Sequence, residues 1–380
     1  MNTVGFSSTQ RSFGFARITD MLRGLDLFLI AAAALLVLFG VLALYSLDGG
    51  IVGFGSKSFR QIGWVAVSLF AFIVFSFLDY NQLRKNAGLL FIGSIVLLIT
   101  VLIIGKAAHG TTGWIQFGQF GFQPVELVKI VLIVVLARFF SATQNLSILW
   151  MVVGSFILAL IPFALVLLQP DLGSGILFIV VWFGLIVVRG LSWRWITAIL
   201  VTALIIAAAG WTALKPYQQD RVLTFLEPGQ RSSAAGYQAI QSVVAVGSGE
   251  ILGRGLGFGS QSQLRFLPEA STDFVFAAIA EEFGFIGVMI FFAAFVFLCY
   301  RLYVTAATSR DDFAYLVAAG MFILLSAEVF INSAMNVGLF PITGIPFPLV
   351  SYGGSSLLAT FIGLGIIQSV FRRRKALSFS

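Results

Sequence analysis

The sequence predicts an all-α, polytopic membrane protein with about ten transmembrane helices and one large extracytoplasmic loop between helices 7 and 8. Hydrophobic residues make up 59% of the chain, charged residues make up 10%, and the mean hydropathy is +1.01. A soluble globular domain usually carries about 25% charged residues. The apolar residues form runs of membrane-spanning length, and one long polar stretch, residues 215–272, interrupts them.

Each predicted span is a run of roughly 20 predominantly apolar residues, the length that crosses the hydrocarbon core as a helix. The runs lie at about 25–46, 59–78, 87–105, 123–141, 147–168, 172–189, 193–214, 273–303, 313–336 and 347–371. The first run is long enough to stay in the bilayer as an anchor. Short connections join the fourth to the seventh run, which predicts that these four helices are antiparallel neighbours.

The distribution of basic residues predicts the orientation. A cytoplasmic N-terminus places most of the Lys and Arg residues of the short loops inside, as the positive-inside rule requires. Both ends are then cytoplasmic: residues 1–24 form one tail and residues 372–380 form a basic tail. The long loop, the 169–173 turn and the 341–348 stretch all fall on the outer face. We therefore expect the working side of the protein to be extracytoplasmic.

Composition also excludes several classes of protein. The net charge of +7 is spread over short loops, so it does not indicate nucleic-acid binding. Cys299 is the only cysteine, which rules out an intrachain disulfide. His109 is the only histidine, so a histidine-based zinc site and a Ser–His–Asp triad are not expected. The glycine-rich stretch 253–260 is not a Walker motif, and no other nucleotide motif is present.

Several ionisable residues lie in or beside predicted spans, where such groups mark functional sites or ion pairs. Glu126 and Lys129 are three residues apart and share one helical face. They are either an ion pair that neutralises itself or groups that line a substrate cavity. Asp171 opens the sixth span after a proline, where a carboxylate caps the helix. Its place on the outer face also leaves a cavity-lining role open.

Asp273 stands where the long loop becomes the eighth span. A cap is one reading, and a general base for a hydroxyl at the water–membrane boundary is the other. The predicted span begins at Asp273, and eight residues of helical rotation put Glu281 within about 80° of its face. Glu282 would then point the opposite way. We expect Glu281 to share a cavity with Asp273, with Lys129 as a partner, and Glu328 is a further buried acid.

Several separate motifs lie between the third span and the end of the chain. They are Gly113-Trp-Ile, Phe122-Gln-Pro-Val-Glu-Leu-Val-Lys129, Gln169-Pro-Asp-Leu-Gly173, Arg221-Val-Leu-Thr-Phe-Leu-Glu-Pro228, Gly236-Tyr-Gln-Ala-Ile-Gln-Ser242, Gly247-Ser-Gly249, Gln261-Ser-Gln-Leu-Arg-Phe-Leu-Pro-Glu269, Thr272-Asp-Phe-Val-Phe-Ala-Ala-Ile-Ala-Glu-Glu282 and Pro346-Phe-Pro-Leu-Val-Ser-Tyr-Gly-Gly-Ser355. In sequence and in order they resemble the motifs of one family, the RodA/FtsW/SpoVE (SEDS) proteins of bacterial elongation, division and sporulation. The fourth and seventh of these motifs look more like RodA than FtsW.

The resemblance implies a SEDS-type transmembrane domain over residues 25–371, in the bacterial inner membrane. It implies a peptidoglycan glycosyltransferase that polymerises lipid II for cell elongation and rod shape. The implied partners are lipid II, a class B penicillin-binding protein and other elongation proteins. The family's essential Asp corresponds to Asp273.

The resemblance also assigns substrate-binding residues. They are Trp114, Glu126, Lys129 and, in the last motif, Ser351, beside the candidates Asp171, Arg221, Arg265 and Glu281 from the polar and acidic stretches. Two positions depart from the family pattern. Gly113 stands where the family usually has Arg, and Ser271 stands where it usually has His.

The mechanism we expect is inverting. Asp273 deprotonates the acceptor hydroxyl, which displaces undecaprenyl diphosphate from the donor. Arg221, Arg265 or a divalent cation (Mg²⁺ or Mn²⁺) neutralises the leaving group. The alternatives are a non-catalytic scaffold for the penicillin-binding protein and a lipid II flippase.

Overall fold

The computed structural model describes residues 24–53, 55–108, 111–117, 120–143, 147–210, 212, 219, 223–226, 234–264 and 266–374. The candidates Arg221 and Arg265 lie outside these residues, as do nearly all of the predicted N-terminal tail and most of the C-terminal one.

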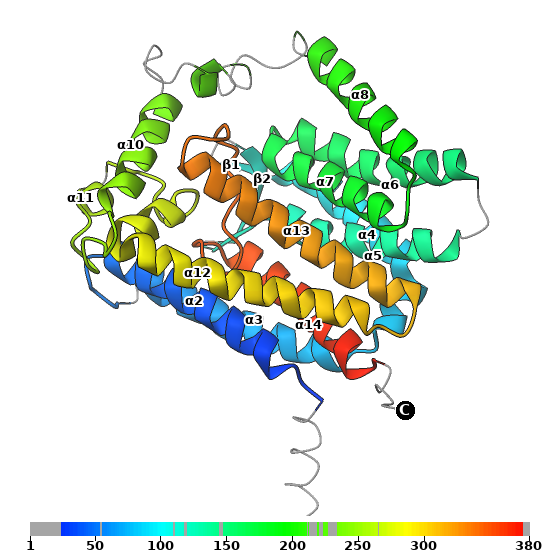
Figure 1. Ribbon diagram of the computed structural model, residues 1–380, viewed down its shortest axis with the longest axis horizontal. Helices are drawn as coiled ribbons and strands as arrows, with labels where there is room; N and C mark the ends of the chain where they lie inside the picture. Colours follow the sequence, from blue (N-terminus) through cyan, green and yellow to red (C-terminus); the bar gives the residue numbers. More distant parts are fainter. Residues whose placement is uncertain are drawn as a thin grey trace, which may run out of the picture.

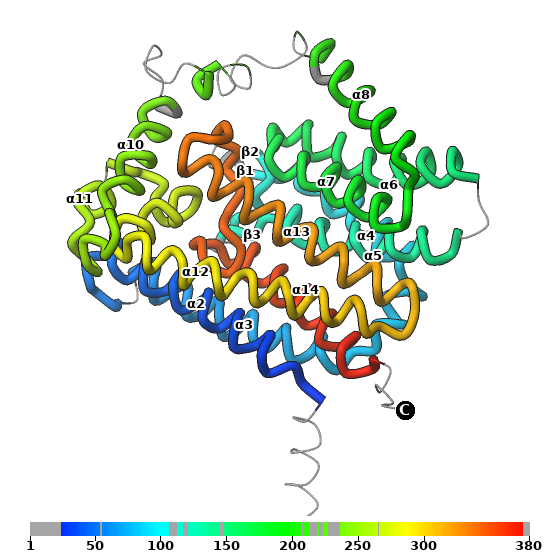
Figure 2. Tube along the Cα trace, in the orientation of Figure 1, coloured from blue at the N-terminus to red at the C-terminus, as the bar shows by residue number. Residues whose placement is uncertain are grey.

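A helix lies at each of the ten predicted runs (Figures 1 and 2). These helices are α2 (Leu27–Leu47), α3 (Lys57–Phe77), α4 (Tyr80–Ile104), α5 (Val125–Ala142), α6 (Ile148–Leu168), α7 (Leu172–Val188), α8 (Trp193–Gly210), α12 (Val275–Ala307), α13 (Asp312–Asn336) and α14 (Gly354–Arg372). In the described residues, eight helices are long and apolar enough to cross a membrane. The other two are α7, which has 17 residues, and α5, which carries Glu126, Lys129 and Arg138. The predicted class of helical membrane protein is confirmed.

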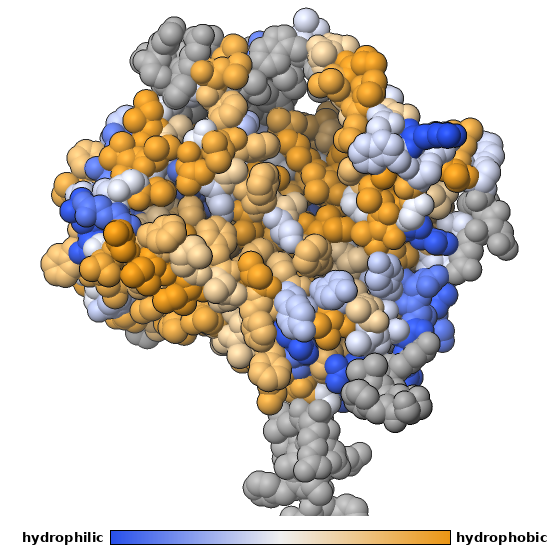
Figure 3. Space-filling model, in the orientation of Figure 1, coloured by the Kyte–Doolittle hydropathy of each residue, from blue (hydrophilic) through white to orange (hydrophobic). Residues whose placement is uncertain are grey.

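Helix α13 lies near the centre of the bundle. It packs against α12 on one side and against α5 and α7 on the other, while α2 and α3 pack against α12 and α14 respectively (Figure 1). Of the four predicted neighbours, α5, α6 and α7 are in contact with one another, whereas α8 has no comparable contact with them. Helix α8 stands apart, and its most apolar stretch has no buried residue. Apolar side chains cover much of the face seen in Figure 3, as expected of a surface that meets lipid.

A small antiparallel sheet, which the sequence did not predict, joins α4 to α5. Its strands are β1 (Lys106–Ala108), β2 (Thr111–Phe117) and β3 (Phe120–Phe122), in the order β1-β2-β3. Gln116 pairs with Gly121 and Ile115 pairs with Phe122. Strands this short give no readable alternation of polar and apolar residues, so the sequence pattern did not indicate them. The sheet carries Trp114 to the end of the bundle where α5 and α7 begin.

The long helix α12 is broken at Gly284, whose φ of 64° and ψ of −168° are not helical. The residues on both sides of the break bond to the loop that follows α10 (Ala234–Ser248). The amides of Arg254 and Gly255 donate to the carbonyls of Glu281 and Glu282, and the amides of Phe285 and Ile286 donate to residues 250 and 251. The loop therefore supplies the backbone partners that a continuous helix would supply itself.

Replacing Gly284 with Ala should destabilise the protein by about 1–3 kcal/mol or more, because only glycine adopts this backbone region without strain. A Cβ there would also lie 2.1 Å from the amide nitrogen of Gly253. Thermal unfolding of the purified protein in detergent measures the effect. Gly63→Ala on exposed α3, where nothing lies within 4 Å of the new Cβ, is the matched control and should not lower the Tm. Equal melting temperatures for the two variants would contradict the prediction.

Candidate functional site

A polar cleft of about 570 Å³ opens at the end of the bundle where several helices begin. Its walls come from the N-terminal ends of α3, α7 and α14, from β2 and from the turns on either side of them. Three sequence-predicted site residues line it: Trp114, Asp171 and Asp273. Segments far apart in the sequence, all assigned to the outer face by charge, thus meet in one place.

Asp273 is half-buried in a turn that precedes α12, which begins at Val275. Two fully buried amides of α13 hold its backbone carbonyl. Asn332 Nδ2 donates to it over 3.0 Å, and Asn336 Nδ2 donates over 3.1 Å. Asn336 also accepts the amide of Ala277 through Oδ1, so it ties the first turn of α12 to α13. These two asparagines fix Asp273 at the wall of the cleft.

Ser351 does not line the cleft. Its hydroxyl is buried and donates to the carbonyl of Thr272, and it accepts the amide of Phe347 over 2.8 Å. The amide of Tyr352 donates to the carbonyl of Ser271 over 2.8 Å. The last family motif therefore acts on the backbone before Asp273. The role that fits Ser351 is positioning of that backbone, in contrast to the predicted contact with substrate.

The prediction that Glu281 shares the cavity of Asp273 is wrong. Its fully buried carboxylate accepts the amides of Gln261 (2.8 Å) and Ser262 (3.0 Å) and the Ser262 hydroxyl (2.8 Å). It therefore anchors α11 (Ser260–Gln263) against α12. The helical rotation failed as a guide because α12 starts after Asp273. Glu282 accepts hydrogen bonds from the hydroxyl of Ser46 and from the amide of Gly257, which lies in the loop before α11.

Glu126 and Lys129 lie in a buried ion-pair triad and do not line the cleft. Lys129 Nζ is 2.8 Å from Glu126 Oε2 and also binds Glu328 Oε1 on α13. All three side chains are 4% exposed or less. Of the two readings left open by the sequence, the ion pair is confirmed, and Lys129 does not partner Glu281. The triad joins α5 to α13 beneath the cleft.

Asp171 has both features that the sequence left open. It caps α7, because Oδ1 accepts the amide of Ser174 over 3.0 Å and Oδ2 accepts its hydroxyl over 2.8 Å. It also lines the cleft, where Gln123 Nε2 donates to Oδ2 over 3.2 Å. Burial raises the pKa of Asp171, and the hydrogen bonds from Ser174 oppose that rise.

Trp114 reaches the cleft from β2 across a glycine. A Cβ at Gly121 would lie 3.1 Å from Trp114 Cε3, so the ring lies close over that position. Gly121 and Gln123 belong to the same connection and also line the cleft. The sheet thus positions the indole of Trp114 in the cleft near the start of α5.

The sequence did not single out the cations of this cleft. Of the described residues that line it, Lys57 and Arg60 are the basic ones, and both come from the first turns of α3. Lys57 Nζ donates to Ser271 Oγ over 2.8 Å. Glu269 adds a third acid beside Asp171 and Asp273. The predicted orientation puts Lys57 and Arg60 on the outer face, beside the other cleft residues, and this was the signal in the sequence that could have found them.

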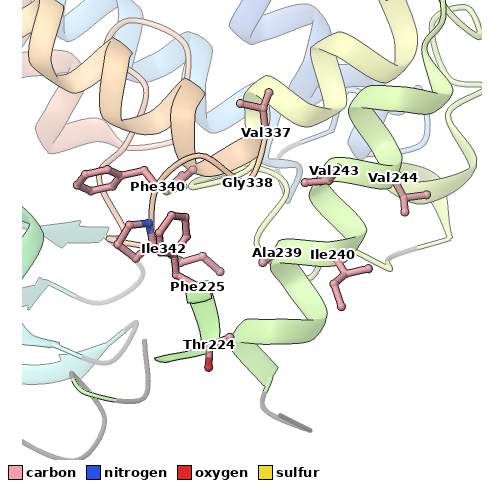
Figure 4. Close-up of a pocket in the computed structure, with 12 residues that line it drawn as sticks. Thr224, Phe225, Ala239, Ile240, Val243, Val244, Val337, Gly338, Phe340 and Ile342 are labelled. Atoms are coloured by element: carbon pink, nitrogen blue, oxygen red, sulfur yellow. The ribbon is translucent and has the colours of Figure 1, made fainter. Parts of the chain in front are cut away.

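A second, apolar pocket of about 390 Å³ adjoins the cleft. Figure 4 shows Ala239, Ile240 and Val243 of α10 on one side, and on the other side residues that follow α13, namely Val337, Gly338, Phe340 and Ile342. Ile342 lines both the pocket and the polar cleft. The two spaces therefore offer adjoining surfaces for a polar group and an apolar one.

The described residues hold no group of three or more His, Cys, Asp or Glu side chains that would form a metal cage. Mg²⁺ is commonly held by one or two carboxylates together with substrate phosphates. The acids of the cleft, Asp171, Glu269 and Asp273, fit that mode better than a preformed site.

A family model described as cell cycle protein, covering FtsW, RodA and SpoVE, matches residues 26–376. The chain belongs to the FtsW/RodA/SpoVE family. It is 36% identical to the peptidoglycan glycosyltransferase MrdB of Escherichia coli K12, over 93% of this chain and 94% of that protein. It is 29% identical to the peptidoglycan glycosyltransferase RodA of Treponema pallidum, over 92% and 98%.

Two solved structures share the fold of this family member. A chain in a peptidoglycan synthase complex aligns with a TM-score of 0.79 and 32% identity, covering 92% of this chain and 98% of that one. The crystal structure of the rod shape determining protein RodA from Thermus thermophilus aligns with a TM-score of 0.71 and 29% identity, covering 93% and 98%. The resemblance drawn from the motifs is confirmed.

Replacing Lys129 with Met should destabilise the protein by about 3–5 kcal/mol, because it leaves two buried acids without a cation. Thermal unfolding in detergent measures the loss. The triple variant Glu126→Gln, Lys129→Met, Glu328→Gln removes every charge together and should recover most of the Tm. A stable Lys129→Met protein that has lost its activity would instead favour a substrate-binding role.

Asp171→Asn should keep or raise the Tm at about pH 8, whereas Asp171→Ala should lower stability by about 1 kcal/mol, since Asn caps a helix as well as Asp does. The raised pKa of Asp171 means that ionisation of the buried carboxyl costs stability as the pH rises through that pKa. The amide avoids this cost. If Asp171→Asn melted as low as Asp171→Ala, the negative charge itself would be structural.

Proposed function

We propose that this protein is a peptidoglycan glycosyltransferase that polymerises lipid II into glycan strands. The observation that carries the proposal is the position of Asp273. Two asparagines hold its backbone carbonyl, and the residue lines a cleft that also contains Lys57, Arg60 and Trp114. Relatives along nearly the whole chain carry the name peptidoglycan glycosyltransferase.

The reaction we propose is a displacement at the anomeric carbon of the donor sugar. The acceptor hydroxyl gives its proton to Asp273 while its oxygen bonds to that carbon. The bond from the carbon to the diphosphate oxygen breaks, and its electron pair leaves with undecaprenyl diphosphate. One displacement inverts the configuration of the carbon.

The two adjoining spaces suit the two ends of such a substrate. The polar cleft would hold the sugars and the diphosphate, while the apolar pocket beside it would take the first part of the prenyl chain. Asn332, Asn336 and Ser351 fix the backbone around Asp273, so the base is placed before the substrate arrives. A divalent cation would bind between the cleft acids and the phosphates.

We further propose that the chain works in the bacterial inner membrane, with both termini cytoplasmic and the cleft on the outer face. A class B penicillin-binding protein would be its partner for elongation. The related structure of a peptidoglycan synthase complex supports an assembly of this kind.

Asp273→Asn should lower the rate of glycan polymerisation by about 10²–10⁴-fold, the usual contribution of a general base. The assay follows glycan formation from lipid II by the full-length protein in detergent, with and without the penicillin-binding partner. Gel filtration and the Tm check that the variant is folded, and the asparagines hold the backbone of residue 273 in both proteins.

Undiminished polymerisation by Asp273→Asn would refute the proposed base. A wild-type protein that polymerised nothing, alone or with its partner, would favour a scaffold or a flippase.

A further inference from the structure

The first turns of α3 contain two cations and no acid, an arrangement that weakens an isolated helix. Lys57 is the first helical residue, Arg60 follows one turn later, and the first turn has no acidic residue. The N-terminus of a helix carries partial positive charge, so cations there are unfavourable and anions are favourable. Asp48 Oδ2 accepts the amide of Ser58 over 2.7 Å, so one carboxylate already meets this helix end, and the two cations beside it face the cleft.

In the described structure, the partners of Lys57 and Arg60 are uncharged groups. Lys57 donates one hydrogen bond, to the uncharged hydroxyl of Ser271, and forms no ion pair with the described residues. Arg60 donates to the carbonyl of Gly55 and lies 5.9 Å from the ring centre of Tyr352. Its Nε is buried and has no hydrogen-bond partner in the described structure. An ammonium group has three donors, so Lys57 keeps two for a ligand.

Ser271 places this charge next to the proposed base. It lies two residues before Asp273, its backbone is held by Tyr352, and its side chain is 2.8 Å from Lys57 Nζ. It is also the position where the family resemblance leads one to expect a histidine. In this chain, α3 delivers the basic group, and the serine at position 271 leaves room for it and orients it.

We propose that Lys57, held by Ser271, binds the diphosphate of the lipid-linked donor and supplies the positive charge that a histidine at position 271 would otherwise bring. This inference rests on the proposed function and adds a binding residue to it. The negative charge that develops on the leaving diphosphate would lie against Lys57, with Arg60 and the start of α3 behind it.

Binding of farnesyl diphosphate to the purified full-length protein in detergent tests the inference without catalysis. Lys57→Met should weaken this binding by about 10–100-fold, the effect of losing a charge-assisted hydrogen bond in a partly buried site. Farnesol, which lacks the phosphates, should bind both proteins equally. Lys85→Met, which removes an exposed lysine on α4, is the matched control and should bind as the wild type does.

A double variant tests the equivalence with histidine. Lys57→Met with Ser271→His should regain diphosphate binding at about pH 6, where an imidazole of pKa about 6.5 is mostly protonated, and lose it at about pH 8. A merely structural role for Lys57 would not produce this pH dependence. Gel filtration and the Tm confirm that each variant is folded.

The inference and the proposed function can fail separately. Polymerisation of lipid II by the wild type tests the function alone. Unchanged binding of farnesyl diphosphate to Lys57→Met, or no recovery by the double variant at about pH 6, would overturn the inference while that activity stood. Competition by phosphatidylglycerol in mixed micelles at matched concentration would also overturn it, because the site would then recognise a phospholipid headgroup.

Discussion

The backbone carbonyl of Asp273 is the point on which the geometry of the cleft depends. Two side-chain amides from one helix meet there, at Asn332 and Asn336. The carbonyl lies just before α12, and the amide of Ala277, one turn later, donates to Asn336 instead, so the carbonyl takes its partners from α13. By supplying them from α13, the chain fixes a loop residue as firmly as a helical one. The Ser351 hydroxyl does the same for the preceding carbonyl, so three spans converge on two peptide units.

Buried acids divide into two groups by what they bind. Glu126 and Glu328 share Lys129, so one buried cation binds two buried acids inside the bundle. Glu281 instead accepts backbone amides of a loop, and Glu282 accepts a hydroxyl and an amide. Neither group faces the cleft. An ionisable residue in a span therefore marks a constraint, and its partners decide whether that constraint concerns the fold or the chemistry.

Much of the fold could be predicted because hydrophobic length is a strong signal in a lipid solvent. The ten runs and their helices agree within a few residues at most ends, although the helix in the third run starts at Tyr80 and the last at Gly354. Counting charges across the membrane put the turn of Asp171 and the loop that ends at Asp273 on the same outer face, whereas Trp114 was singled out by the family resemblance. The position of Glu281 could not be predicted, because helical periodicity applies only within one helix and α12 begins after Asp273. Lys57 and Ser271 are 214 residues apart, and no local pattern connects them.

The break of α12 at Gly284 has a consequence for how this family member tolerates change. Loops usually accept insertions and deletions, because few backbone groups depend on them. The loop around residues 250–255 is different, because its amides and carbonyls form the hydrogen bonds that α12 lacks at Gly284. Adding or removing one residue there would move the amides and carbonyls of the loop out of register with their partners in α12. Among related chains, this loop should therefore vary in its exposed side chains but keep a fixed length.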